Sequence, residues 1–198
     1  MSSFSFLSDS YATERLKTLS VWSQVPDDRM RFRPESRART PHEHMVHQCV
    51  SEDAWMKNML GIAASRPPLP VEETRVAFLE HYAACSAERL AQLEEKADDW
   101  FSGEAQFFDV PRTRAWIVTR RLTHSAHHRG QLTVYLRLWG EALYSTYGPT
   151  ADTGGLFQHQ APVIYRYPSI DGLLAGEREG GVNPPLPGPG SHSPTERP

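Results

Sequence analysis

The chain has 198 residues, of which 39% are hydrophobic and 10% aromatic, enough for one domain with a real core and a tail. Its net charge of -3 lacks the basic excess that is typical of nucleic-acid-binding domains, so we expect no nucleic-acid partner. The N-terminal sequence has no signal-peptide pattern, and no apolar run reaches membrane-spanning length. We therefore expect a cytoplasmic protein with no membrane partner.

The two cysteines, Cys49 and Cys85, have no CxxC partner. Two thiols are too few for the disulfide framework of a small secreted domain. We expect both to be free, half-buried helix residues in a reducing compartment.

The first predicted helix covers about 8–23, where apolar residues recur at helical spacing, and Pro26 ends it. Residues 24–40 form a long connector that carries an alternating run of arginines. We favour a solvated loop for this run because acidic residues dilute its charge, and an anion-binding strip is the alternative. The arginines are Arg29, Arg31, Arg33, Arg37 and Arg39.

The second helix has the clearest start, because Thr40, Pro41 and Glu43 fit a capping box with proline at the first helical position. Gly61 should end this helix. A third helix is predicted over about 72–97, after the breaker SRPPLP, and an aromatic turn over 100–110. The fourth helix should run from 109–111 to Gly140, and no strand pattern competes with these helices.

Four helices with one long first connection predict an all-α fold, a four-helix bundle. The segment 141–174 is expected to be an irregular C-terminal extension that packs on the bundle. Residues 1–174 would thus be one domain, and the Pro/Gly-rich residues 175–198 a disordered tail.

Three histidines lie within five positions of the fourth helix: His124, His127 and His128. A turn of about 100° per residue places His124, His128, Gln131 and Tyr135 on one inward stripe. Residues four apart on a helix can converge on one ion, so a metal site is one interpretation. A hydrogen-bonded histidine pair is the other, and the spacing alone does not decide between them.

A third ligand should come from the second helix. We choose His47, one turn into that helix, and His44 as the second choice, since His42 and His44 should lie near solvent in the first turn. His127 is expected at the seam between helices or hydrogen-bonded behind the ligands, and His81 at the surface or seam. Three imidazoles leave a coordination position open, as in catalytic zinc sites, and nitrogen ligands suit Zn, Ni, Cu or Fe.

The stretch HSAHHRGQLTVYLRLWG at 124–140 resembles the signature of the DinB/YfiT-like family. FRPESRARTPHEHMVHQCVSEDAW at 32–55 is similar to the other half of that signature and places His47 and Glu52 in register. The resemblance covers about 8–155. It implies a four-helix bundle, a divalent metal held by His47, His124 and His128, and often a homodimer.

The family resemblance also implies thiol-dependent transferases or isomerases. Our first hypothesis is a transferase that joins a low-molecular-weight thiol to a small electrophile, with Gln131 or Tyr135 bonded to water or substrate. Arg129 and Arg121 would be carboxylate clamps, although a salt bridge suits Arg129 equally well.

A metal-dependent hydrolase and a non-catalytic, metal-stapled interaction protein are the alternatives. An open coordination position beside a pocket of small-molecule size favours an enzyme. A fourth protein ligand, or closure by Tyr135 or Trp55, favours the staple.

Overall fold

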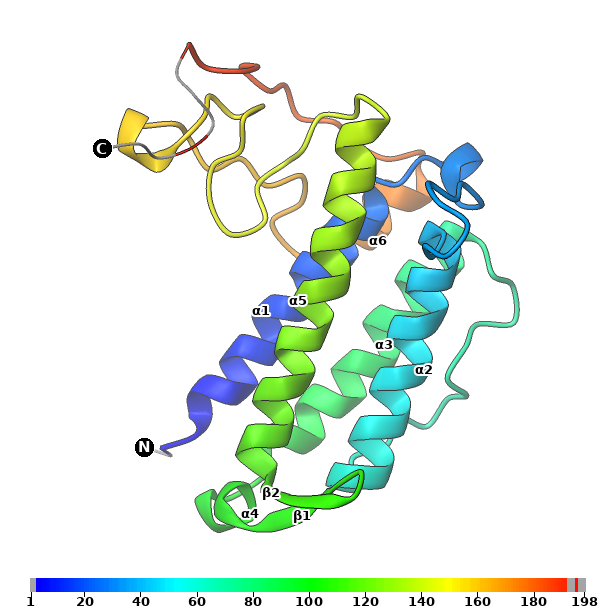
Figure 1. The fold of residues 1–198 in the computed structure, drawn as a ribbon, viewed down its shortest axis with the longest axis vertical. Helices are drawn as coiled ribbons and strands as arrows, with labels where there is room; N and C mark the ends of the chain where they lie inside the picture. The colour runs from blue at the N-terminus through cyan, green and yellow to red at the C-terminus, as the bar shows by residue number, and fades with distance from the viewer. Residues whose placement is uncertain (1–2, 192–194, 196–198) are drawn as a thin grey trace.

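In the computed structural model, which describes residues 3–191 and 195, the chain is mostly helical (Figure 1). Four long helices lie side by side: α1 packs against α3 and α5, and α2 packs against the same two helices. Within these residues no helix has both the length and the hydropathy needed to cross a membrane. The elements are α1 Ser5–Ser23, η1 Asp27–Arg29, α2 Pro41–Leu60, α3 Arg75–Glu94, α4 Asp98–Ser102, β1 Glu104–Phe107, β2 Val110–Thr113, α5 Arg114–Leu138, η2 Phe157–His159 and α6 Ile170–Arg178.

The start of α2 has the predicted capping box. The Thr40 side chain accepts a hydrogen bond from the Glu43 backbone N–H (3.1 Å), and the Glu43 carboxylate accepts one from the Thr40 N–H (2.8 Å). Gly61, with φ of 68°, ends the helix in the left-handed conformation that glycine adopts without strain. The other long helices overlap their predicted ranges and differ at the ends, since α1 begins earlier and α3 and α5 are shorter.

The prediction of no strands is wrong for one short hairpin. Residues 104–113, expected as a turn and the start of a helix, form the antiparallel pair β1–β2 beside α4 (Figure 1). The Phe107 ring packs edge-on against Trp55 of α2 and Trp116 of α5, at centroid distances of 5.2 and 5.0 Å. These tertiary contacts support a four-residue strand that is too short to show a clear sequence period.

The helix α6 crosses the domain boundary that we expected at residue 174. Ser169 caps α6 by accepting a hydrogen bond from the Gly172 N–H, Leu173 is buried, and Glu177 pairs with Arg166 at 3.1 Å. Two glycines lower the helix propensity of this segment, which explains why no helix was predicted there. Of the predicted tail, residues 192–194 and 196–198 lie outside the described residues.

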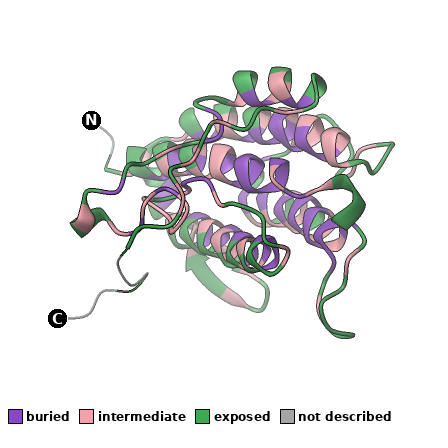
Figure 2. Ribbon diagram, turned by 90° about the horizontal axis from the view of Figure 1, so that it is seen from above, coloured by how far each residue is buried: buried purple, intermediate pink, exposed green. Residues whose placement is uncertain are grey.

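The inward faces of the long helices bury two apolar clusters. Figure 2 shows the buried residues in purple along these helices. On each long helix the residues of one cluster are separated along the chain from those of the other by buried polar side chains. We call this set the polar layer, and it comprises Arg15, Gln48, Glu52, Ser86, Arg89, Arg121 and Ser125. The cysteines are free, as expected, but buried rather than half-buried.

Candidate metal centre

The structure brings together the three histidines predicted as ligands. One ring nitrogen from each of His47, His124 and His128 lies within 4.8 Å of the others. The His124 and His128 Nε2 atoms are 3.3 Å apart, because residues four apart stack on one face of α5. The His47 ring on α2 lies 4.6 Å from that of His128 and 5.3 Å from that of His124, between centroids.

This spacing fits a tetrahedral ion. Two nitrogens that each lie about 2.0–2.1 Å from a zinc ion are about 3.3–3.4 Å apart in tetrahedral coordination. The distance between the His124 and His128 Nε2 atoms equals that spacing. Three imidazole nitrogens suit a divalent ion such as Zn²⁺, and the His124–His128 pair already has the separation, whereas the three nitrogens together lie within 4.8 Å.

Gln131 fixes the orientation of the His128 ring. The Gln131 Oε1 atom lies 3.0 Å from His128 Nδ1 and can only accept, so Nδ1 carries the proton and Nε2 presents its lone pair. A hydrogen bond from His124 Nε2 to that lone pair would leave His124 Nδ1 as an acceptor, yet this buried atom has no hydrogen-bond partner. A cation between the two Nε2 atoms would accept both lone pairs, and the His124 proton would then lie on Nδ1, which has no partner among the described residues.

All three rings are neutral at physiological pH. Burial lowers the pKa of His124 to about 3 and that of His128 to about 4, and it also lowers the pKa of His47. The positive charge of Arg121 further lowers the pKa of His124. Metal ligation requires the neutral imidazole, so burial prepares these side chains for it.

The remaining histidines lie outside the triad. His44 and His42 are buried, which corrects their predicted exposure: the preceding connector covers the first turn of α2, and the His42 N–H donates to the Met30 carbonyl at 3.0 Å. The His44 ring lies 5.4 Å from that of His128, burial lowers its pKa to about 3, and its Nδ1 atom has no partner. His127 is exposed and meets His128 edge-on.

An aromatic wall covers one side of the triad. The Trp55 ring lies 5.3 Å from the His124 ring at an interplanar angle of 32°. Phe107 and Phe108 of the hairpin pack edge-on against Trp55, and the Arg121 guanidinium lies over it at 5.4 Å. The unexpected hairpin thus supports the ring that shields His124.

A cavity of about 310 Å³ lies near the triad. Its lining includes Gln131 and His44, which both contact His128. Its volume is at the lower end of the range for small-ligand pockets. Tyr135 also lines the cavity, but its hydroxyl donates to the Arg39 carbonyl at 3.0 Å. Gln131 and Tyr135, predicted to bind water or substrate, are therefore engaged with the protein.

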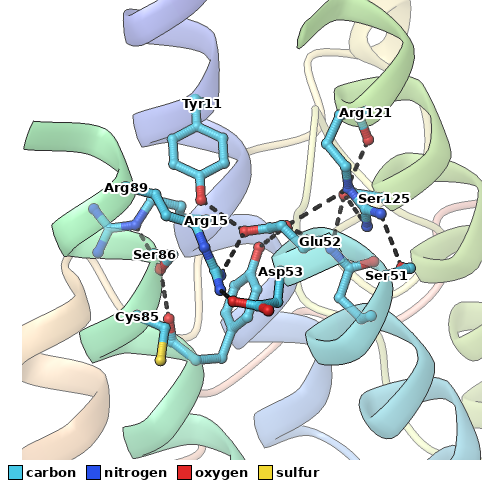
Figure 3. A network of polar contacts seen from close by, with 12 residues as sticks. Tyr11, Arg15, Ser51, Glu52, Asp53, Cys85, Ser86, Arg89, Arg121 and Ser125 are labelled. Carbon is cyan, nitrogen blue, oxygen red and sulfur yellow. Dashed lines mark hydrogen bonds and ion pairs between the residues drawn. The ribbon is translucent and has the colours of Figure 1, made fainter. Parts of the chain in front are cut away.

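The two arginines predicted as carboxylate clamps are buried in ion pairs with the protein itself. Arg121 lies 3.7 Å from Glu52 and donates to Ser51 and Ser125 (Figure 3). Arg129 pairs with Glu14, on the side of α5 that packs against α1. Neither guanidinium lines the cavity beside the triad.

Glu52, completely buried, is the centre of the polar layer. It accepts hydrogen bonds from Tyr11 (2.6 Å), Tyr82 (3.0 Å) and Gln48 (2.9 Å), and Arg89 lies 3.4 Å away (Figure 3). The sequence placed Glu52 only in a family motif, and its partners on α1 and α3 carry no local signal of this network.

Comparisons with known proteins identify the family and similar folds. A family model described as the DinB family matches residues 1–155. A DinB-like protein from Bacillus cereus ATCC 10987 is 18% identical with a TM-score of 0.59, over 71% of this chain and 95% of that chain. A second, from Bacillus subtilis, is 18% identical with a TM-score of 0.58, over 71% and 96%. At this identity the likeness concerns the fold alone, and no curated protein matches.

Proposed function

The chain belongs to the DinB family, and from that premise we propose that it is a metal-dependent transferase on a four-helix bundle. In this proposal His47, His124 and His128 hold a divalent ion, and a low-molecular-weight thiol is joined to a small electrophile. The observation that carries the proposal is the convergence of three neutral imidazoles beside a cavity of small-molecule size.

A divalent ion supplies Lewis acidity, which lowers the pKa of a thiol or water bound to it. The three ligands are uncharged and do not offset the charge of the ion, so an anionic partner such as a thiolate is favoured. Gln131 keeps the proton of His128 on Nδ1, and Trp55 shields His124 from water on one side.

The geometry favours an enzyme over a metal-stapled protein. Among residues 3–191 and 195, no fourth His, Cys, Asp or Glu joins the triad with a comparable spacing. The Tyr135 hydroxyl is engaged by the Arg39 carbonyl. Three protein ligands leave a coordination position for water or substrate, as in catalytic zinc sites.

The first test is the metal content of protein purified without chelator. Wild type should hold about one divalent ion per chain, and His124→Ala should hold almost none. His127→Ala is the matched control, because His127 lies three positions away on the same helix but is exposed and outside the triad. Metal-free wild type that also fails to take up added Zn²⁺ would refute the proposal.

The second test is turnover of electrophiles such as an alkyl halide or an epoxide with glutathione, mycothiol or bacillithiol. Product formation should require both the metal and the thiol. Turnover that needs the metal but no thiol would indicate hydrolysis instead, and no turnover with any thiol would contradict the transferase.

We also propose a homodimer, which light scattering should detect as twice the chain mass.

A further inference from the structure

The connector before α2 presents one arginine without a counter-charge. Within the part of the chain that the structure describes, the Arg39 guanidinium has no hydrogen-bond or ion-pair partner. Its neighbours are engaged, and this difference singles out Arg39 from the run of arginines. Arg29 pairs with Asp28, Arg33 with Glu43 and Arg37 with Glu35, and Arg31 contacts the His42 ring.

The backbone that carries Arg39 is held at three consecutive residues. Arg33 donates to the Ala38 carbonyl at 2.5 Å, Tyr135 donates to the Arg39 carbonyl at 3.0 Å, and the Thr40 N–H donates to Glu43 at 2.8 Å. Little backbone entropy is then lost when a ligand binds the Arg39 side chain. The capping box thus helps to hold the backbone at Arg39 as well as the start of α2.

Arg39 lines the same cavity as His44 and Gln131, and Gln131 holds the triad residue His128. No acidic side chain lines this cavity in the described part of the chain. His44, only 2% exposed, contributes the unpartnered Nδ1 atom described above. The cavity is thus lined by two arginines, Arg37, which pairs with Glu35 at 3.4 Å, and Arg39, which has no such partner within the described ranges, and this positive lining suits a negatively charged ligand.

We propose that Arg39 binds the carboxylate of a small ligand in this cavity, while the ligand's thiol lies at the histidine triad. The proposal rests on the proposed function and adds a substrate class to it, a thiol that bears a carboxylate. A planar guanidinium matches a carboxylate with two parallel hydrogen bonds. In this proposal Arg39 has the carboxylate-binding role that the sequence suggested for Arg121 and Arg129, whose guanidiniums are paired inside the fold.

The test compares acid and amide forms of one thiol on the Co²⁺-loaded protein, using the thiolate-to-cobalt absorption band as the readout. The probes are 3-mercaptopropionate and 6-mercaptohexanoate, each against its neutral amide. Wild type should bind at least one of the acids about 5-fold more tightly than its amide. Arg39→Gln should reduce that preference to about twofold or less.

Arg29→Gln is the matched control, because it removes the same charge from the same connector but does not line the cavity. It should keep the wild-type preference, and all three proteins should hold equal cobalt. An acid preference that survives in Arg39→Gln, or is absent from wild type for both chain lengths, would overturn the carboxylate site.

The failure of the two proposals can be told apart. If wild type binds cobalt but the thiols give no absorption band, or if it binds no cobalt, the proposed function fails. Propionate is then titrated into the metal-free protein and followed by NMR at the His44 ring, which wild type and Arg39→Gln both retain. Shifts in wild type that disappear in Arg39→Gln would support the carboxylate site, and their absence from wild type would refute it.

Discussion

Replacing Glu52 by glutamine should strongly destabilise the fold, although the side chain keeps its size. Glu52 is completely buried, and two guanidiniums that are at most 2% exposed face it, Arg89 at 3.4 Å and Arg121 at 3.7 Å. Arg89 keeps a second partner, Asp53 at 2.9 Å, whereas Glu52 is the carboxylate that pairs with Arg121. Burial already lowers the pKa of Arg121, so its charge is only partly offset even with Glu52 present.

Removing one partner of a buried ion pair costs about 3–5 kcal/mol. We expect the lower end, about 3 kcal/mol, for Glu52→Gln, because the amide still accepts hydrogen bonds and Arg89 retains Asp53. A typical domain is stable by about 5–15 kcal/mol, so this loss is a large part of the total. The same change leaves a positive charge behind His124 without its carboxylate, and the affinity for divalent metal should fall as well.

Urea unfolding of the metal-free protein, followed by circular dichroism, measures the effect. The cycle needs wild type, Glu52→Gln, Arg121→Met and the double variant, which should recover about 2 kcal/mol relative to additivity because no unpaired charge remains. Glu80→Gln is the control, since it removes the same charge from an exposed pair with Arg178 and should cost less than about 1 kcal/mol. A loss below about 1 kcal/mol for Glu52→Gln, with additive variants, would refute this account of the polar layer.

Two further outcomes follow from the triad and its neighbours. Gln131→Ala should lower zinc affinity about 10–100-fold in a chelator competition, because His128 loses the acceptor that fixes its tautomer. Gln131→Glu should restore most of the affinity. A zinc affinity of Gln131→Ala equal to that of wild type would contradict this role. The second outcome concerns pH and the metal-free protein. Each buried histidine with a lowered pKa should reduce the free energy of unfolding by up to about 1.4 kcal/mol per pH unit as pH drops below about 6.5. Unfolded His44 takes up a proton near that pH, whereas the folded side chain, with its pKa lowered to about 3, does not. His44→Gln should therefore flatten the pH dependence of the urea midpoint, and an equal slope in both proteins would count against a buried, neutral His44.

The features that sequence predicted well depend on neighbouring residues. The capping box at Thr40 and Glu43 needs only the spacing of two side chains on one helical turn, and the structure has it. The same holds for the shared stripe of His124 and His128, which follows from 3.6 residues per turn. His47 required the further assumption that α2 faces α5 at the right level. Its place one turn into the second helix suggested this, and the family resemblance agreed with it.

The features that sequence missed depend on partners distant in the chain. Arg121 and Arg129 lie on the same predicted helix as His124 and His128, and Arg129 lies within their motif, which suggested a role at the site. Their carboxylates come from α2 and α1, and nothing near them in sequence shows that these pairs form. Arg39 is the opposite case, an arginine in a mixed-charge connector that stays unpaired because the nearby acids are taken by other arginines.

The polar layer lies next to the histidine triad, and this position suggests why the fold keeps buried ionic groups. Buried ionic groups are costly, and an apolar layer of equal volume is often as stable or more so. This layer lies between the two apolar clusters, at the level of the histidines. On α5, Arg121 and Ser125 are near His124, and on α2, Gln48 is next to His47. Hydrogen bonds from Gln48 to Ser125 and from Arg121 to Ser51 link α2 to α5 at that level. We infer that the layer holds these two helices in the register at which their histidines meet, so metal affinity should fall in variants of the layer even where the fold survives.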